Sequence, residues 1–255
     1  MADATVADLL GEDLLCHWDA SGATSVWADT GGTSQAGDGD DVKGWSQQSD
    51  ASQSGLLTEA TNPPVYDADY DATGYPAVVF DGTNEKLYIA STGITTGAAR
   101  LVLSVITYVS GVTNYCFGNA NSQYLRLYSG NSFQGSGIGT GVLSGSSPAK
   151  QCVAARFDSP WLAVGQSAGV GGTTGMNAGL TGAFTLGALN LNGTFSQYGA
   201  CAVHEVLLIA GTCEFGQVVR CSKLLASKWG LTDNNATPQL TGGLLRVGMN
   251  GGFGG

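Results

Sequence analysis

Apolar residues along this chain occur in short runs that end at Gly, Asn, Asp, Ser or Pro. From residue 76 onward the runs follow one another regularly and are rich in β-branched and aromatic side chains. Short apolar runs that end at turn-forming residues are typical of strands in antiparallel sandwiches or barrels. We predict roughly ten strands, among them residues 77–80, 86–89, 101–109, 114–118, 124–128, 151–157, 161–164, 184–191 and 198–209.

The first third of the chain is more polar and less periodic. An apolar segment at 14–18 leads into a turn signal at 19–22. Residues 21–75 contain many Gly, Asp, Asn and Pro residues, which favour turns and loops. We predict ordered loops with short strands here, held to the core by Trp27 and Trp45.

One segment has the pattern of a helix, from about residue 214 to 228. Thr212 is the predicted N-cap, and Glu214 complements the positive end of the helix dipole. Gly230 supplies the C-terminal stop. Apolar residues at helical spacing define one face: Phe215, Val218, Val219, Leu225 and Trp229.

These elements predict an all-β fold, a two-sheet antiparallel sandwich with one C-terminal helix. We divide the chain into an N-terminal arm (1–13), a sandwich domain (14–231) and a glycine-rich tail (232–255). The tail carries too few apolar residues to fold alone, so we expect it to become ordered only on a partner. Those residues are Leu240, Leu244, Leu245, Val247, Met249 and Phe253.

Composition narrows the class of partner. Of the 255 residues, 43% are hydrophobic but only 12% are charged, so Gly, Ser, Thr, Asn and Gln must cover the surface. The net charge is −10, and the ten basic residues are scattered, which argues against nucleic acid and against anionic membranes. The N-terminus lacks the pattern of a signal peptide, and the most apolar run is too short to span a bilayer.

Six cysteines occur without a CxxC pair, so we expect no structural zinc site. Their spacing is wide and irregular for a disulfide scaffold. We expect most of them to be buried free thiols.

Three stretches of the chain carry a family resemblance. They are residues 15–21 (LCHWDAS), residues 76–82 (PAVVFDG), and residues 202–208 (AVHEVLL) followed by 224–231 (LLASKWGL). In this order they resemble concanavalin A-like, laminin G-like jelly-roll domains of bacterial surface proteins and phage virion proteins. The resemblance implies a concanavalin A-like sandwich, a fold that hosts lectins, adhesins, capsid-surface proteins and glycanases.

Catalytic chemistry has little support in the sequence. Glycanases that this fold resembles place alternate carboxylates along one strand, whereas Glu205 has no carboxylate two residues away. We expect Glu205 to be structural. The two histidines, His17 and His204, lie beside apolar strand residues, so we expect both to be hydrogen-bonded at the edge of the core and not to act in catalysis. We therefore expect no enzyme, no catalytic residue and no cofactor.

Two acidic segments raise a calcium hypothesis. Asp67, Asp69 and Asp71 resemble the start of an EF-hand loop, but Ala72 stands where that loop needs Gly and Val78 where it needs Glu. A second acidic turn covers residues 38–41. We interpret both as solvated loops and leave calcium as the alternative.

Glycan binding is the remaining chemistry. Strand alternation would place Tyr124, Arg126 and Tyr128 on one face, where aromatic rings and a guanidinium could hold a sugar. The alternative is that this face merely covers a sheet.

The leading hypothesis is a non-enzymatic phage virion structural protein, either a capsid decoration protein or another particle-surface protein with a lectin-like module. Its expected partners are other virion proteins of the capsid or tail, together with further copies of itself. The alternative is a glycan-binding adhesin or tail-associated receptor-binding protein that contacts host-surface glycans. The expected location is the virion surface, or in the alternative the extracellular space or cell surface.

Overall fold

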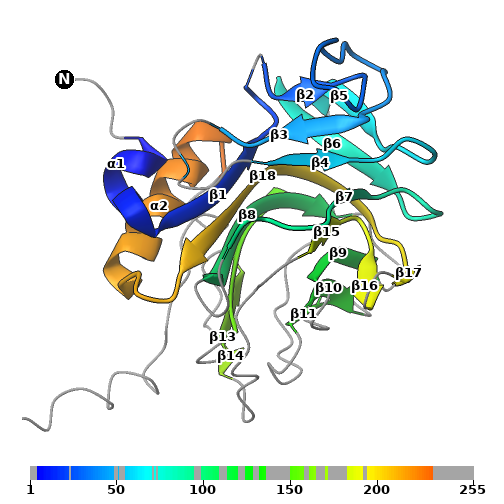
Figure 1. The fold of residues 1–255 in the computed structure, drawn as a ribbon. Helices are drawn as coiled ribbons and strands as arrows, with labels where there is room; N and C mark the ends of the chain where they lie inside the picture. The colour runs from blue at the N-terminus through cyan, green and yellow to red at the C-terminus, as the bar shows by residue number, and fades with distance from the viewer. Residues whose placement is uncertain are drawn as a thin grey trace, which may run out of the picture.

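The computed structural model confirms the predicted fold class. The chain is mostly β, with two large antiparallel sheets and a helix near the C-terminus (Figure 1). The structure describes residues 5–22, 24–48, 51, 55–70, 72, 74–94, 99–108, 114–119, 124–128, 132–135, 150–157, 161–164, 170–171, 183–191 and 194–231. The predicted tail at 232–255 therefore lies outside the described residues.

Sheet A is built around the long strand β18 (Ala200–Ala210). On one side β18 pairs with β8, and on the other side it pairs first with β6 and then with β1. The remaining order, from one edge to the other, is β14 (Val170–Gly171), β13 (Trp161–Val164), β12 (Lys150–Arg156), β8 (Ala99–Tyr108), β18, β6 (Tyr75–Asp81) and β5 (Val65–Tyr70), with β1 (Leu14–Asp19) beside β18.

Sheet B faces sheet A, and within the described residues each of the two sheets has eight strands. The hairpin of β16 (Leu189–Leu191) and β17 (Thr194–Ser196) forms a separate two-stranded sheet. The order in sheet B is β11 (Ser132–Gly135), β10 (Tyr124–Tyr128), β9 (Asn114–Asn119), β15 (Phe184–Leu186), β7 (Leu87–Ile89), β4 (Leu56–Thr58), β3 (Gly44–Ser46) and β2 (Val26–Trp27).

Aromatic rings fill the space between the two sheets. Trp18 of β1 stacks on Phe184 of β15, with ring centroids 5.4 Å apart and planes inclined by 9°. Phe117 of β9 contacts Phe184 and also Phe157, which follows β12. All four side chains are buried. Because residues alternate along a strand, the inward position of Trp18 directs its neighbours His17 and Asp19 to the outer face of sheet A.

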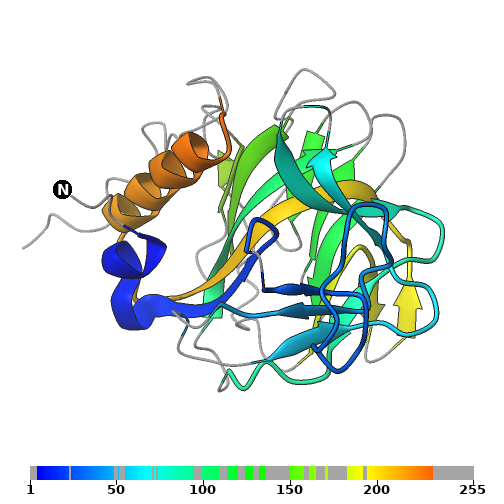
Figure 2. The ribbon, with the colours of Figure 1, turned by 90° about the horizontal axis from the view of Figure 1, so that it is seen from above.

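The helices lie together on that outer face (Figures 1 and 2). The short helix α1 (Val6–Leu10) begins with a Thr5–Asp8 capping box, and a 3₁₀ turn, η1 (Gly11–Asp13), leads from it into β1. The longer helix α2 (Phe215–Lys228) packs against α1 and sheet A, burying Val218, Cys221, Ser222, Leu225 and Ala226.

Two details of the α2 prediction were wrong. Glu214, not Thr212, is the N-cap, because the Thr212 hydroxyl donates to Asp13 instead. Phe215 is 37% exposed, because it lies in the first turn and the buried residues of α2 begin only at Val218. The predicted stop at Gly230 is confirmed: its φ is +60°, and Leu231 N–H donates to Ala226 O.

The predicted strand at 184–191 is divided into β15 and β16 by Gly187. Gly187 has φ +77°, a conformation that side chains disfavour, and a Cβ there would lie 2.2 Å from Cδ1 of Phe80. The chain therefore leaves sheet B at a point where only glycine fits.

Candidate functional site

The centre of the candidate site is a β-bulge in β18. Val203 pairs with Ile106 of β8, and the next registered pair is Glu205 with Val105. His204 is therefore the extra residue of β18, with no residue opposite it in β8. Ala20 N–H donates to His204 O where β18 changes from pairing with β6 to pairing with β1. A bulge lets two successive side chains reach the same face. His204 and Glu205 accordingly both contact Trp229, at the C-terminal end of α2.

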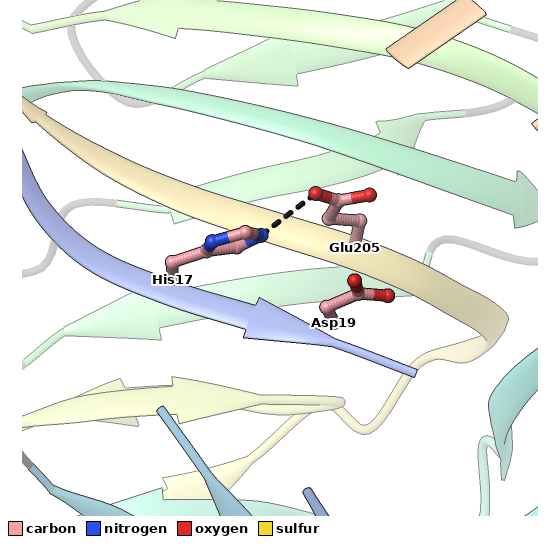
Figure 3. Close-up of side chains that lie close together, drawn as sticks. All are labelled: His17, Asp19 and Glu205. Carbon is pink, nitrogen blue, oxygen red and sulfur yellow. Dashed lines mark hydrogen bonds and ion pairs between the residues drawn. The ribbon is translucent and has the colours of Figure 1, made fainter. Parts of the chain in front are cut away.

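Glu205 is fully buried, and donors from two other elements surround its carboxylate. One oxygen accepts from Nε2 of His17 at 2.7 Å (Figure 3). The other accepts from Nζ of Lys228 at 2.7 Å and from Nε1 of Trp229 at 2.5 Å. A buried carboxylate is stable only when such donors replace its lost hydration.

Asp19 completes this group, which we call the Glu205 network (His17, Asp19, Glu205, Lys228 and Trp229). Asp19 lies directly opposite Glu205 in the β1–β18 pair. Its Oδ2 accepts from Lys228 Nζ at 2.6 Å, while its Oδ1 holds the following turn through Ser21. The Lys228 ammonium therefore bridges two carboxylates that would otherwise repel each other.

The electrostatics of Lys228 follow from this position. Burial on its own would lower the pKa of the ammonium, but the charges of Glu205 and Asp19 outweigh burial, and the pKa is raised above 10.5. The network thus ties β1, β18 and the C-terminal end of α2 together through one buried charge cluster.

The same residues offer a set of metal ligands. One ligand atom each from His17, Asp19 and Glu205 lie within 4.8 Å of one another. Lys228 Nζ lies within hydrogen-bonding distance of both carboxylates, and its positive charge takes the part that a cation would play there. The geometry is that of an internal ion-pair network.

His204 occupies a separate polar niche beside the network. Nδ1 lies 2.8 Å from Pro76 O, which can only accept, so Nδ1 carries the proton. Nε2 lies 3.0 Å from the Thr107 hydroxyl and accepts from it. Burial lowers the pKa of His204 to about 3, so the ring is neutral at physiological pH.

Both histidines therefore have the structural setting that the sequence predicted. His17 is 5% exposed and His204 is fully buried, and each is hydrogen-bonded. The rings of Tyr70 and Trp229 enclose His204, at centroid distances of 5.9 and 5.1 Å.

The predicted glycan-contact residues lie on β10 in sheet B, away from the Glu205 network. The guanidinium carbon of Arg126 is 5.4 Å from the centroid of the Tyr124 ring, so these two half-buried side chains are neighbours. Tyr124 lies opposite Gly118, the residue over which Ala188 and Leu189 pass. The side chain of Tyr128 lies outside the described residues.

The acidic segments of the calcium hypothesis lie side by side at the edge of sheet A. Backbone hydrogen bonds join residues 39–42 to β5, including Gly39 N–H to Tyr66 O and Tyr66 N–H to Asp40 O. Asp38 accepts from Ala68 N–H, and Asp67 accepts from Asp69 N–H. These carboxylates shape the loops, and Asp71 lies outside the described residues.

The cysteines are buried free thiols, as predicted. Burial raises the pKa of Cys16, Cys152 and Cys221 to about 12 and that of Cys213 to about 11. Thiols in this state are poor nucleophiles.

Sequence reasoning missed Asp19 and Lys228 as partners of Glu205. The prediction considered only carboxylates on the same strand as Glu205, whereas Asp19 contributes from β1, the neighbouring strand. The available signal was the resemblance itself, because its first and third stretches supply every member of the network.

Comparison with known proteins gives no closer assignment. Neither models of protein families nor curated proteins match the chain. Among the described residues, the structure contains no helix long and apolar enough to cross a membrane.

Proposed function

We propose that the protein is a non-enzymatic structural protein of a bacteriophage particle, carried on a concanavalin A-like sandwich. Its place is the particle surface, as a capsid decoration protein or a related surface component. Its partners are other virion proteins and further copies of this chain.

One observation carries the non-enzymatic part of the proposal. Both oxygens of Glu205 are engaged by His17, Lys228 and Trp229, and the carboxyl group has no contact with solvent. An acid or nucleophile in glycoside hydrolysis must instead reach the scissile bond from a cleft. The carboxylates Glu205 and Asp19 are committed to holding the fold together.

The virion part of the proposal is supported by the resemblance and by the surface. Only 12% of the residues are charged, and the net charge of −10 disfavours contact with nucleic acid. The two-sheet architecture is compatible with the sandwich that the resemblance implies. A rigid sandwich with a weakly charged, hydroxyl- and amide-rich surface suits packing onto an assembly.

Mass spectrometry of purified particles tests this proposal. Particles from the source phage would be banded by density, disassembled and digested. We expect peptides of this chain in stoichiometric amounts relative to the major capsid protein, and antibody labelling on the particle surface. Absence of the chain from banded particles, while it is abundant in the lysate, would refute the proposal.

A second candidate function, glycan binding, is favoured by the stacking of Arg126 on Tyr124. Aromatic rings and guanidinium groups are suited to sugar faces and hydroxyls. A glycan array with the wild-type protein would detect binding that Tyr124→Ala and Arg126→Ala both abolish. Tyr66→Ala, on the opposite sheet, is the control that should leave binding unchanged. Binding that survives both substitutions on β10 would exclude this face.

A further inference from the structure

One lysine ammonium lies between two carboxyl groups on the outer face of sheet A. Nζ of Lys228 is 2.6 Å from Oδ2 of Asp19 and 2.7 Å from Oε2 of Glu205. The two carboxyl groups come from directly opposed positions in the β1–β18 pair (Figure 3). An amine and a carboxyl group are the reactants of amide formation, and holding them together removes much of the entropic barrier to their reaction.

The carboxyl group of Asp19 is arranged to accept such an attack. Its second oxygen, Oδ1, accepts from Ser21 N–H at 2.8 Å and from the Ser21 hydroxyl at 2.7 Å. Attack at Cγ would place negative charge on that oxygen, and two donors already aimed at it would stabilise the tetrahedral intermediate. Oδ2, the oxygen beside Nζ of Lys228, is then the leaving group. The Asp19 side chain is only 13% exposed, so few water molecules surround the reacting atoms.

Glu205 is placed to move the protons. Its Oε2 lies within direct proton-transfer distance of Nζ of Lys228, and its side chain has no exposure to solvent. His17 and Trp229 hold this carboxylate in position through their own hydrogen bonds. The ion pair and the neutral pair of amine and acid contain the same number of protons, so the reactive pair arises without proton uptake from solvent.

We propose that Lys228 and Asp19 condense to an intramolecular amide, with Glu205 as the group that transfers a proton. Nζ bonds to Cγ of Asp19, and the bond from Cγ to Oδ2 breaks. The ammonium gives up two protons, one of them by way of Glu205, and both leave with Oδ2 as one water molecule. Glu205 ends as the carboxylate it was, and no oxidant or further reactant is consumed. The step occurs once in each chain, so it is a self-modification and not enzymatic turnover.

The ion pair is the starting state, and the amide is its slow product. Although burial opposes it, the charges of Glu205 and Asp19 raise the pKa of Lys228, so nearly all of the amine is protonated at neutral pH. The amide should therefore accumulate in the folded protein over time. It would join the end of β1 to the end of α2, two positions that are 209 residues apart.

The experiment follows the intact mass of the full chain. Freshly folded protein is incubated in neutral buffer over days, and samples are reduced, denatured in urea and measured by mass spectrometry. We expect a growing fraction whose mass is lower by one water molecule and whose digest joins the peptide of Asp19 to that of Lys228. Trypsin should no longer cleave after Lys228 in that fraction. The melting temperature should rise with the cross-linked fraction, because the closed loop restricts the unfolded chain.

The position of the water loss decides its meaning. Aspartate followed by glycine can also lose water, by closing to a cyclic imide, and this pair of residues occurs at 38–39 and at 81–82. Peptides that cover these two positions are therefore mapped in the same digest. Water loss confined to them, with no peptide joined to that of Lys228, would overturn the proposal.

A second ion pair provides the matched control within the same chain. The side chains of Lys86 and Glu59 are 14% and 10% exposed, but among the described residues Lys86 contacts no second carboxylate. We expect no cross-link between them. Lys228→Met should lose the cross-linked product, and Glu205→Gln should slow its formation about 100-fold, the size of a lost proton-transfer group.

Three results would overturn the proposal. The first is a folded wild-type protein that keeps its full mass throughout the incubation. The second is a Lys86–Glu59 cross-link that forms as fast as the Lys228–Asp19 cross-link. The third is a folded Glu205→Gln protein that reacts at the wild-type rate. If Glu205→Gln fails to fold by circular dichroism, the wild-type mass and the comparison of the two ion pairs decide.

Discussion

Replacing Lys228 with methionine tests whether the Glu205 network holds the fold. Methionine keeps the length and the helix propensity of lysine but removes the charge that bridges Asp19 and Glu205. Glu205 would remain fully buried with only His17 and Trp229 as donors, opposite a second carboxylate. The perturbation therefore leaves a buried charge undercompensated.

The structure sets the size of the effect. Removing one partner of a buried ion pair typically costs about 3–5 kcal/mol. The Lys228 side chain is 31% exposed and that of Asp19 is 13% exposed, so water screens part of the interaction. We expect a loss of about 3 kcal/mol in the free energy of unfolding, within a total of about 5–15 kcal/mol for a typical domain.

Lys43→Met is the matched control. Lys43 also pairs with an aspartate, but Nζ lies 3.7 Å from Asp41, and the two side chains are 36% and 57% exposed. Exposed pairs contribute about 0–1 kcal/mol. In urea unfolding followed by circular dichroism, the midpoint of Lys228→Met should be clearly lower than that of wild type, whereas the midpoint of Lys43→Met should hardly change. The dependence of the unfolding free energy on urea concentration should be similar in all three proteins.

The pH dependence gives an independent test. Because the pKa of Lys228 is raised above 10.5 in the folded protein, its stabilisation is fully present below that pH and is lost as the pH rises through the folded-state pKa. The advantage of wild type over Lys228→Met should therefore be constant near neutrality and shrink above about pH 10.5. Equal stability of Lys228→Met and Lys43→Met at pH 7 would refute the structural role of the network.

Three further predictions follow from the same structure. Because the pKa of His204 is lowered to about 3, its contribution to the free energy of unfolding should be complete above pH 6.5 and should fall towards pH 3, by up to about 1.4 kcal/mol per pH unit. His204→Gln should therefore flatten the plot of unfolding free energy against pH in this range. An unchanged slope of that plot would contradict the neutral buried ring. Gly187→Ala should lower the free energy of unfolding in urea by about 3 kcal/mol or more, because the new Cβ meets Phe80. Gly39 also has a positive φ, +80°, but its Cβ would meet open space, so Gly39→Ala should lower it by only about 1 kcal/mol. Equal losses for the two variants would mean that backbone strain alone matters. The wild-type protein should release no reducing sugar from common β-glucans, and turnover that disappears in Glu205→Gln would reverse the non-enzymatic assignment.

Local patterns in the sequence were sufficient for the fold class. Short runs bounded by turn residues predicted an antiparallel β protein, and the apolar spacing with Gly230 predicted where α2 ends. The burial of both histidines and of the four cysteines in strands was also predictable, because their neighbours in the strands are apolar. Each of these properties depends on residues close together in the chain.

The tertiary structure decided the rest. His17 and Glu205 are 188 residues apart, and Asp19 meets Glu205 only because β1 pairs with one half of β18. The division of residues 184–191 at Gly187 depends on Phe80, which reaches it from the facing sheet. Periodicity specifies which face of a strand is buried, but it does not specify which distant strand lies beside it, because pairing is selected by the packing of the whole core.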